Sequence, residues 1–386
     1  MSAPRVLFYV QHLLGIGHLQ RALTLARAMV SAGLEVSLAS GGPPVPGMAL
    51  DGVRLVQLPP ASAADLSFKV LQDASGRPIN AEWKRQRSAA LHAAWLAAAP
   101  QVLILELFPF GRRQMRFELL PLLDAAAASP QRPAIVCSVR DILGGEQSQE
   151  RQQQTLALVE RHFDRVMVHG DPSVIAFERT FPAASRVASR IEYTGYVVDA
   201  AASSAGDAGR DEVIVSAGGG AVGARLLETA MRAKPLSALR DRNWRLLAGN
   251  NLSAAEYEKL SVLARSSIGV VLERSRPDFT TLLSNCELSI SQAGYNTLME
   301  TVQARARAVV VPFAGGNETE QTLRASCFAE RGLLEMVEEG ALTPQALAAA
   351  VDRAARKPRP LAGAIALDGA ARCAASIAQL AQGGKR

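Results

Sequence analysis

The chain has 386 residues, which is too many for one ordinary hydrophobic core and indicates two domains. Hydrophobic residues make up 48% of it without forming a run long enough for a transmembrane helix, a composition typical of soluble globular proteins. The net charge of +6 is spread evenly and no basic, aromatic-rich motif occurs, so we expect no nucleic-acid partner. Attraction to an anionic substrate or membrane surface stays open.

The cysteines and the N-terminal residues favour a cytoplasmic location. The four cysteines lie far apart, with no Cys-x-x-Cys pair and no Cys/His ligand spacing: Cys137, Cys286, Cys327 and Cys373. We therefore expect neither structural zinc nor a disulfide framework. Arg5–Tyr9 leads directly into a glycine turn, which predicts a first strand rather than a signal peptide.

Short apolar runs alternate with helical patterns along the first half of the chain, beginning with a strand at Arg5–Val10. Further strands are predicted at Val36–Ala39, Arg54–Leu58, Val102–Leu105, Ala134–Ser138 and Arg165–Val168, and helices at Leu19–Ala32, Ala81–Ala98, Phe117–Ala128 and Glu146–Phe163. This alternation predicts a parallel sheet with helices on both faces.

A second α/β series follows a linker rich in Ala, Ser, Gly and Asp. Its strands are predicted at Glu212–Ser216, Trp244–Leu247, Gly269–Leu272, Leu288–Ile290 and Val309–Val311, and an Ala-rich helix at Gly363–Ala381 ends the chain. We therefore predict an N-terminal domain over 1–198, a linker over 199–210, a C-terminal domain over 211–362 and a closing helical segment over 363–386. Two such halves place a ligand cleft between them.

The first chemical motif, Gly15-Ile16-Gly17-His18, follows the first strand. The glycines allow a tight turn and let a large ligand approach the start of the next helix. His18 would lie in the first helical turn, where an imidazole that titrates near neutrality suits proton removal from a hydroxyl. A carboxylate such as Asp141 is the alternative base, and a histidine that merely caps the turn is the alternative without chemistry.

A second glycine turn, over 216–223, lies between the strand Glu212–Ser216 and the helix that follows. Its candidate phosphate-approach residues are Gly218, Gly219, Gly220 and Gly223. The turn matches G-x-G-x-x-G, but a dinucleotide site needs a carboxylate after the next strand, and that strand runs into Gly249-Asn250. We therefore favour a phosphate loop over an NAD site, keep Asn250 as a candidate contact, and leave a purely structural turn as the alternative.

The third motif gives the strongest functional signal. A small-residue turn opens a helix, a strand follows, and an acidic-amide pair begins the next helix. Its candidate donor contacts are Gln292, Ala293, Gly294, Asn296, Thr297, Glu300, Glu320 and Gln321. A helix N-terminus suits a diphosphate, a carboxylate two turns on can accept from ribose hydroxyls, and Glu-Gln can bind sugar hydroxyls. That order of parts predicts a nucleotide-sugar site.

Weaker signals mark an acceptor side. Arg140 and His169 each follow a predicted strand, and Phe110 and Arg112 belong to a mixed aromatic and cationic loop that could touch lipid. An ion pair, a loop cap and a solvated loop are the respective alternatives. The sequence contains no P-loop, no G-x-S-x-G elbow and no H-E-x-x-H motif.

These motifs together resemble the GT-B glycosyltransferases, most of all the branch that contains the peptidoglycan N-acetylglucosaminyltransferase and the diacylglycerol glycosyltransferases. The resemblance is strongest over Glu212–Ala325 and extends to Val6–Leu25. It implies an α/β fold of two Rossmann-like, doubly wound parallel-sheet domains that face each other across a cleft, with a C-terminal helix that crosses back to the N-terminal domain.

The resemblance also implies roles for the candidate residues. The C-terminal half would hold a UDP-sugar, with Gly218–Gly223 near the diphosphate, the backbone at Arg274 and Ser275 on uracil, Gln292–Thr297 under the phosphates, Glu300 on ribose, and Glu320 with Gln321 on the sugar. Gly17 and His18 would face the reaction centre. The segment GIGHLQRALTLA is also similar to the UDP-sugar hydrolase of pseudaminic acid synthesis.

We predict an inverting, metal-independent glycosyltransferase that moves a hexose or N-acetylhexosamine from a UDP-sugar to an acceptor hydroxyl, with no cofactor. The acceptor stays open, and a lipid-linked or polysaccharide precursor at the cytoplasmic face of the inner membrane is one option. A UDP-sugar hydrolase of the same fold, a non-catalytic nucleotide-sugar sensor and a sugar epimerase are the alternatives.

Overall fold

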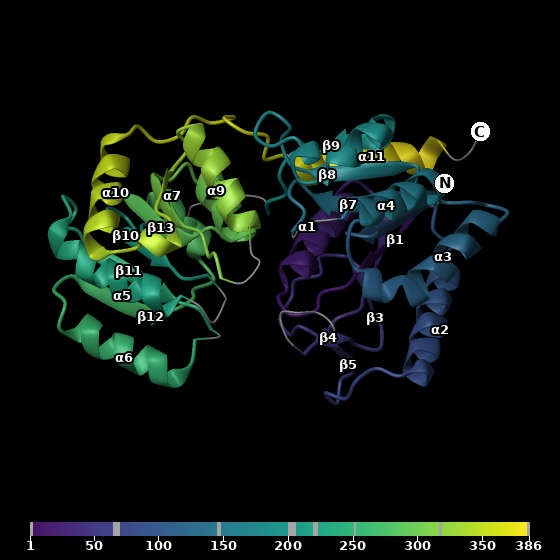
Figure 1. Ribbon diagram of the computed structural model, residues 1–386, viewed down its shortest axis with the longest axis horizontal. Helices are drawn as coiled ribbons and strands as arrows, with labels where there is room; N and C mark the ends of the chain where they lie inside the picture. The colour runs from purple at the N-terminus through teal and green to yellow at the C-terminus, as the bar shows by residue number, and fades with distance from the viewer. Residues whose placement is uncertain are drawn as a thin grey trace. The chain divides into compact units, whose positions relative to one another are not determined.

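The computed structural model describes residues 3–64, 70–144, 148–199, 206–218, 223–250, 252–315 and 319–383. Contacts divide the chain into two units. The first comprises 1–199 together with 368–386, and the second comprises 200–367. Each unit is built on its own parallel sheet (Figure 1).

The first unit contains a seven-stranded sheet in the order β3-β2-β1-β6-β7-β8-β9, in which every neighbouring pair is parallel. Its strands are β1 (Arg5–Val10), β2 (Glu35–Ser40), β3 (Arg54–Gln57), β6 (Val102–Glu106), β7 (Ala134–Arg140), β8 (Arg165–His169) and β9 (Ile191–Tyr193). A short antiparallel pair, β4 (Ser62–Ala63) and β5 (Leu71–Gln72), lies apart from it. The central strands are buried apolar runs, as expected where helices cover both faces.

Helices connect these strands. They are α1 (Gly17–Ser31), α2 (Ala81–Ala98), α3 (Arg116–Ala128) and α4 (Gln149–His162), with short 3₁₀ turns at Arg113–Met115, Phe177–Arg179 and Pro182–Arg190. Local sequence sets two of the starts. Asn80 accepts a hydrogen bond from Trp83 N at the start of α2, and Ser148 accepts one from Arg151 N at the start of α4.

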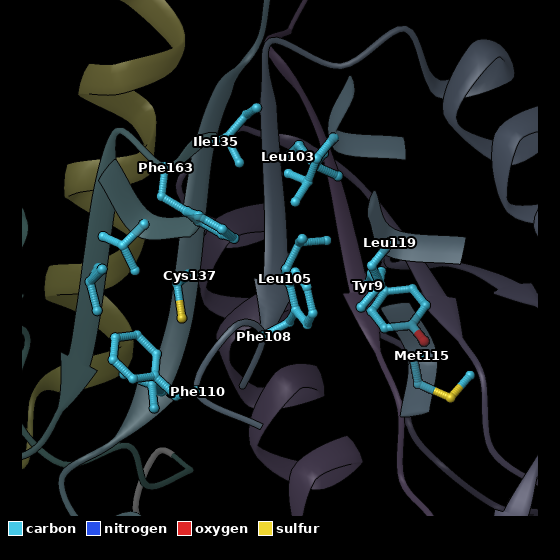
Figure 2. Packing of buried hydrophobic residues seen from close by; sticks show 14 of the residues in the cluster. Tyr9, Leu103, Leu105, Phe108, Phe110, Met115, Leu119, Ile135, Cys137 and Phe163 are labelled. Atoms are coloured by element: carbon cyan, nitrogen blue, oxygen red, sulfur yellow. The ribbon is translucent and has the colours of Figure 1, made fainter. Parts of the chain in front are cut away.

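One apolar cluster of the first unit packs the sheet against α2, α3 and α4 (Figure 2), and a second one includes α1 and the C-terminal residues 373–381. Leu105 of β6 and Cys137 of β7 are fully buried within the first of these clusters. Phe110, which follows β6, packs edge-on against Phe177 and Phe181, with ring centroids 5.2 and 5.0 Å away. The prediction that Phe110 faces an acceptor or a lipid surface is therefore wrong, because its ring completes the core.

The chain returns to the first unit through α11 (Gly369–Gly383), which packs on α1. Gly369 fits closely, since a Cβ at this position would lie 2.3 Å from the carbonyl oxygen of Gly195. The helix begins six residues later than the predicted start at Gly363, which has φ of +75° and cannot belong to a right-handed helix.

The second unit contains a six-stranded sheet in the order β12-β11-β10-β13-β14-β15, again wholly parallel. Its strands are β10 (Val213–Ser216), β11 (Trp244–Ala248), β12 (Val270–Arg274), β13 (Leu288–Gln292), β14 (Ala308–Val311) and β15 (Glu335–Met336). The sequence patterns predicted the first five of these strands to within a few residues but not β15, which has only two residues.

The second unit's helices are α5 (Ala224–Ala233), α6 (Ala254–Arg265), α7 (Phe279–Asn285), α8 (Tyr295–Gln303), α9 (Glu320–Glu330) and α10 (Pro344–Arg356), with 3₁₀ turns at Lys234–Leu236 and Glu339–Ala341. Ser253 and Glu256 form a capping box at the start of α6, and Thr343 caps α10. Among the described residues, no helix is long and apolar enough to cross a bilayer.

Both sheets reverse their strand order at one point, which confirms the predicted doubly wound architecture. In the first sheet the chain runs outward from β1 to β2 and later resumes on its other side at β6. In the second sheet the same reversal lies between β10 and β13. Ligands of such sheets bind beyond the carboxyl ends of the strands at these reversals.

Candidate functional site

His18 lies at the reversal of the first sheet, in the first turn of α1. Its Nδ1 is 3.0 Å from Oε1 of Glu106, the last residue of the neighbouring strand β6. Arg21, one turn further along α1, forms an ion pair with the same carboxylate. About 15% of the His18 side chain is exposed, whereas Glu106 and Arg21 are buried. The imidazole is thus held at Nδ1 while part of its ring is accessible.

Glu106 is ionised despite its burial. Burial by itself raises the pKa of this carboxyl, but the Arg21 guanidinium and the hydrogen bonds from His18 and Ser138 lower it, and the net pKa lies well below the usual range. An ionised carboxylate can only accept hydrogen bonds. In every hydrogen bond to Glu106, the hydrogen must therefore be carried by the other residue.

This requirement fixes the proton on His18. Burial lowers the pKa of His18, the hydrogen bond to Glu106 opposes the change, and nearby arginine charges lower it again, to about 3. The imidazole is therefore neutral near pH 7 and carries one proton. Arg21 Nη2 also lies 3.2 Å from Nδ1, but it donates to Glu106 Oε1. Because Glu106 Oε1, 3.0 Å from Nδ1, can only accept, we assign the proton to Nδ1, and Nε2 keeps its lone pair. The result is a neutral base backed by a carboxylate.

Two further arginines contribute to this electrostatic environment. Arg112 is half-buried, and its Nε donates to the carbonyl oxygen of Gln11 at 2.7 Å. Burial and the charge of Arg140 lower the pKa of Arg112 to about 10, so Arg112 stays cationic at neutral pH. Their positive charges disfavour protonation of His18 and suit an anionic ligand nearby.

Two other candidates of the first unit have different surroundings from those predicted. Asp141 is fully buried, accepts from Ile142 N at 3.0 Å and lies against Gly170, so the carboxylate that contacts His18 is Glu106 instead. His169 is also fully buried, with Ser138 and Thr194 as its hydrogen-bond partners, and therefore does not line an acceptor surface.

The predicted donor contacts come together along one edge of the second sheet. Since all its strands are parallel, the segments that follow β10, β11, β12, β13 and β14 emerge at the same edge. These segments contain Gly218, Asn250, Arg274, Ser275 and the Gln292–Thr297 turn. Residues up to 79 positions apart in sequence thus share one carboxyl edge.

The glycine turn after β10 lies at the reversal of this sheet. Gly218 has φ of +67° and donates its N–H to Ser216 Oγ at 3.3 Å, and Gly223 immediately precedes α5. A Cβ on Gly223 would lie 2.1 Å from that of Ala217, so only glycine fits there. The predicted contacts Gly219 and Gly220 lie outside the described residues.

Arg274 and Ser275 stabilise the neighbouring loop. The Arg274 guanidinium lies 4.2 Å from the Tyr257 ring centroid and donates to the carbonyl oxygens of Gly249 and Leu252, both at 3.1 Å. Ser275 N donates to Ala248 O at 3.0 Å, so this N–H extends the sheet instead of being available to a base. Asn250, in the loop that Arg274 anchors, is exposed.

The turn after β13 has the geometry that the sequence predicted. Gly294 immediately precedes α8, and Ala293 beside it is fully buried. Asn296 and Thr297 lie in the first turn, and Glu300 lies further along the helix, half-buried. The N-terminus of a helix carries the positive end of the helix dipole, which makes the start of α8 suitable for an anion.

The acidic-amide pair begins α9, where both members make contacts within the unit. Glu320 is buried and forms an ion pair with Arg324 at 3.0 Å, one turn along the helix. Gln321 Oε1 accepts from Phe313 N at 3.2 Å, which ties the segment after β14 to α9. Within the described ranges, no group of three His, Cys, Asp or Glu side chains could hold a metal ion.

Comparison with known proteins identifies the fold. Residues 214–377 match the model of the glycosyltransferase family 28 C-terminal domain. The calicheamicin glycosyltransferase CalG4 is 15% identical with a TM-score of 0.60, over 99% of this chain and 95% of that one. MurG from Acinetobacter baumannii is 16% identical with a TM-score of 0.58, over 98% and 100%. This chain has the GT-B glycosyltransferase fold.

A UDP-glucosyltransferase from Polygonum tinctorium has the same GT-B fold, at 13% identity and a TM-score of 0.60 over 99% of this chain and 100% of that one. The family match covers β10 through most of α11 and so includes the glycine turn and the α8 start. The GT-B resemblance inferred from the sequence is therefore confirmed.

Sequence reasoning missed two residues that contact His18 in this GT-B chain. Arg21 lies three residues after His18, a spacing that puts both on one helix face. Glu106 directly follows the predicted strand Val102–Leu105, in the position where sheet ligands are expected. Both signals were present in the sequence, although nothing local paired β6 with β1.

Proposed function

We propose that this chain is an inverting, metal-independent glycosyltransferase that moves a hexose or N-acetylhexosamine from a UDP-sugar to an acceptor hydroxyl. The observation that carries the proposal is the neutral His18, held at Nδ1 by the ionised Glu106 in a chain with a family 28 C-terminal domain. Nδ1–H directed at a carboxylate leaves Nε2 as a base, and an acceptor hydroxyl needs such a base to become nucleophilic.

The reaction follows from this arrangement. The acceptor hydroxyl gives its proton to His18 Nε2 while its oxygen attacks the anomeric carbon. The bond from that carbon to the β-phosphate oxygen breaks, and UDP leaves with the electron pair. Attack opposite the leaving group inverts the anomeric configuration. Glu106 stabilises the imidazolium that forms, as a buried carboxylate does in other histidine bases.

The second unit would bind the donor. The starts of α5 and α8 would direct the positive ends of their helix dipoles at the diphosphate. In other enzymes, each preorganised hydrogen-bond donor stabilises a developing negative charge by about 3–4 kcal/mol. Here such groups would serve in place of a divalent cation. Glu300 would bind ribose, and Glu320 with Gln321 would meet the sugar hydroxyls at the start of α9.

We place this activity in the cytoplasm, with a lipid-linked or polysaccharide precursor as acceptor and peripheral contact with the inner membrane. MurG and the other solved relatives support a glycosyl transfer. The identity of the acceptor within this proposal rests on the sequence resemblance described above.

The test is donor turnover by the full chain. UDP-glucose, UDP-galactose and UDP-GlcNAc are each supplied with and without a lipid hydroxyl acceptor, diacylglycerol, and a soluble sugar acceptor. We expect acceptor-dependent UDP release, a product of inverted configuration by NMR, and no turnover in His18→Ala. His92→Ala, which alters an exposed histidine of α2, is the matched control.

The alternatives give different results in the same assay. The resemblance of GIGHLQRALTLA to a UDP-sugar hydrolase favours that enzyme as the second candidate. Rapid UDP release without acceptor would identify it. Donor binding by thermal shift without any release would instead identify a nucleotide-sugar sensor.

A further inference from the structure

A buried hydrogen-bonded chain continues from Glu106 away from His18. Ser138 on β7 contacts Oε2 of Glu106, and its Oγ lies 2.9 Å from Nε2 of His169, the last residue of β8. Nδ1 of His169 lies 2.8 Å from Oγ1 of Thr194, which follows β9. These three side chains are 0–1% exposed. This hydrogen-bonded chain thus crosses the carboxyl ends of four adjacent strands, β6, β7, β8 and β9.

Only one arrangement of protons gives every contact in this hydrogen-bonded chain one donor and one acceptor. Glu106 is ionised and accepts, so Ser138 donates its single hydroxyl proton to this carboxylate. The Ser138 oxygen must then accept from His169, which places the His169 proton on Nε2. Nδ1 of His169 is left as an acceptor for the Thr194 hydroxyl. Every donor in the chain therefore points toward Glu106.

His169 is neutral, as this arrangement requires. Burial lowers its pKa to about 3, and the Arg21 charge contributes in the same direction. A neutral imidazole donates through one nitrogen and accepts through the other. If Thr194 donated to Gly195 O, 3.1 Å away, two acceptors would face each other across the 2.8 Å contact.

We propose that Ser138, His169 and Thr194 are positioning residues that orient the Glu106 carboxylate and thereby hold His18 as the Nδ1–H tautomer with its Nε2 lone pair available. Ser138 binds Oε2 and leaves Oε1 facing His18, so rotation of the carboxylate would break both contacts. This inference rests on the proposed function only where it assigns the Nε2 lone pair to catalysis.

The first test measures tautomers without any substrate. The full chain is labelled with ¹⁵N in its five histidines, and two-bond ¹H–¹⁵N spectra are recorded between pH 6 and 8. Signals are assigned with His18→Gln and His169→Gln variants. We expect His18 to be neutral with its proton on Nδ1, and His169 to be neutral with its proton on Nε2. A protonated His169, or one with its proton on Nδ1, would overturn the inference.

The second test removes the link with Ser138→Ala. His169 then loses its acceptor, and we expect its proton to move to Nδ1, where Thr194 can accept while it donates to Gly195 O. His18 should develop a detectable Nε2–H fraction. Ser138→Thr retains the hydroxyl and should restore the wild-type spectrum. The matched control is Ser37→Ala, another buried strand serine, whose hydroxyl accepts from Arg54 at 3.0 Å.

Activity supplies a third readout once a donor and an acceptor are known. Ser138→Ala should lower kcat about tenfold with little change in KM for the donor, as expected when a partner that orients a histidine is lost. An unchanged His18 signal together with an unchanged kcat would overturn the positioning role.

The two proposals fail separately. If the spectra show the inferred tautomers but the protein turns over no UDP-sugar, the proposed glycosyltransferase activity is refuted and the positioning role of Ser138, His169 and Thr194 stands. If turnover depends on His18 but the spectrum does not change in Ser138→Ala, the glycosyltransferase activity stands and the positioning role is refuted.

Discussion

Arg87 of α2 and Glu118 of α3 form an ion pair 2.8 Å apart in which neither side chain is exposed. Glu118 Oε1 also accepts from the Tyr9 hydroxyl at 2.6 Å, and Arg87 donates to Gln11 at 2.7 Å. The pair therefore connects two helices to β1, the strand that leads to His18. Burial raises the pKa of Glu118 even with Arg87 present.

We predict that Arg87→Leu lowers the free energy of unfolding by about 3–5 kcal/mol, because it leaves an uncompensated buried carboxyl. This loss of stability should be smaller at acidic pH. Without Arg87 the folded-state pKa of Glu118 rises further above its unfolded value, so the folded state binds more protons and the variant loses stability as pH rises. Urea unfolding at pH 5 and pH 7.5 measures this effect. Arg85→Leu, on the exposed face of the same helix, should change little.

The proposed donor site gives a binding prediction. Glu300→Ala should raise the Kd for UDP at least tenfold, equivalent to about 1.4 kcal/mol, because the proposed hydrogen bond from ribose to this carboxylate would be lost. Calorimetry with the full chain measures it. Glu258→Ala, which removes an exposed carboxylate of α6, is the control and should leave UDP affinity unchanged. Equal affinities in wild type and Glu300→Ala would refute the assignment of Glu300.

The sequence was sufficient for the sheets and for placing the predicted donor contacts along one sheet edge, because both follow from short-range patterns. Alternating apolar strands and helices predict parallel sheets, and in a parallel sheet the loops after successive strands meet at one edge. Gly218 and Gly294 could therefore be assigned to one site from their positions after predicted strands.

The partners of His18 could not be found this way. Glu106 contacts His18 only because β6 pairs with β1, and the intervening chain includes β2 and β3. No local pattern specifies that pairing. The same holds for Phe110, whose mixed aromatic and cationic surroundings in sequence gave no sign of its packing on Phe177 and Phe181.

The pH dependence of turnover follows from the burial of His18. Since its pKa is lowered to about 3, the imidazole stays neutral as pH falls through 6.5, the usual histidine value. We predict that kcat/KM for the donor stays flat between pH 8 and pH 5. A pH–rate profile with the wild-type chain measures this. A tenfold fall for each unit below pH 6.5 would show that His18 titrates normally and that Glu106 and the arginines do not act on it as described.

The close fit of Gly369 gives a stability prediction for the closing helix. A Cβ there would lie 2.3 Å from Gly195 O and 2.6 Å from Tyr196 O, and backbone atoms cannot move aside as a flexible side chain can. Gly369→Ala should therefore destabilise the chain by about 1–3 kcal/mol, the usual cost of overpacking, despite alanine's higher helix propensity. Gly383→Ala, at the other end of α11 with nothing within 4 Å of its Cβ, is the control. Urea unfolding measures both, and limited proteolysis should cut the residues around α11 faster only in Gly369→Ala. Equal stability of the two variants would mean that α11 does not pack this closely on the 195–196 backbone.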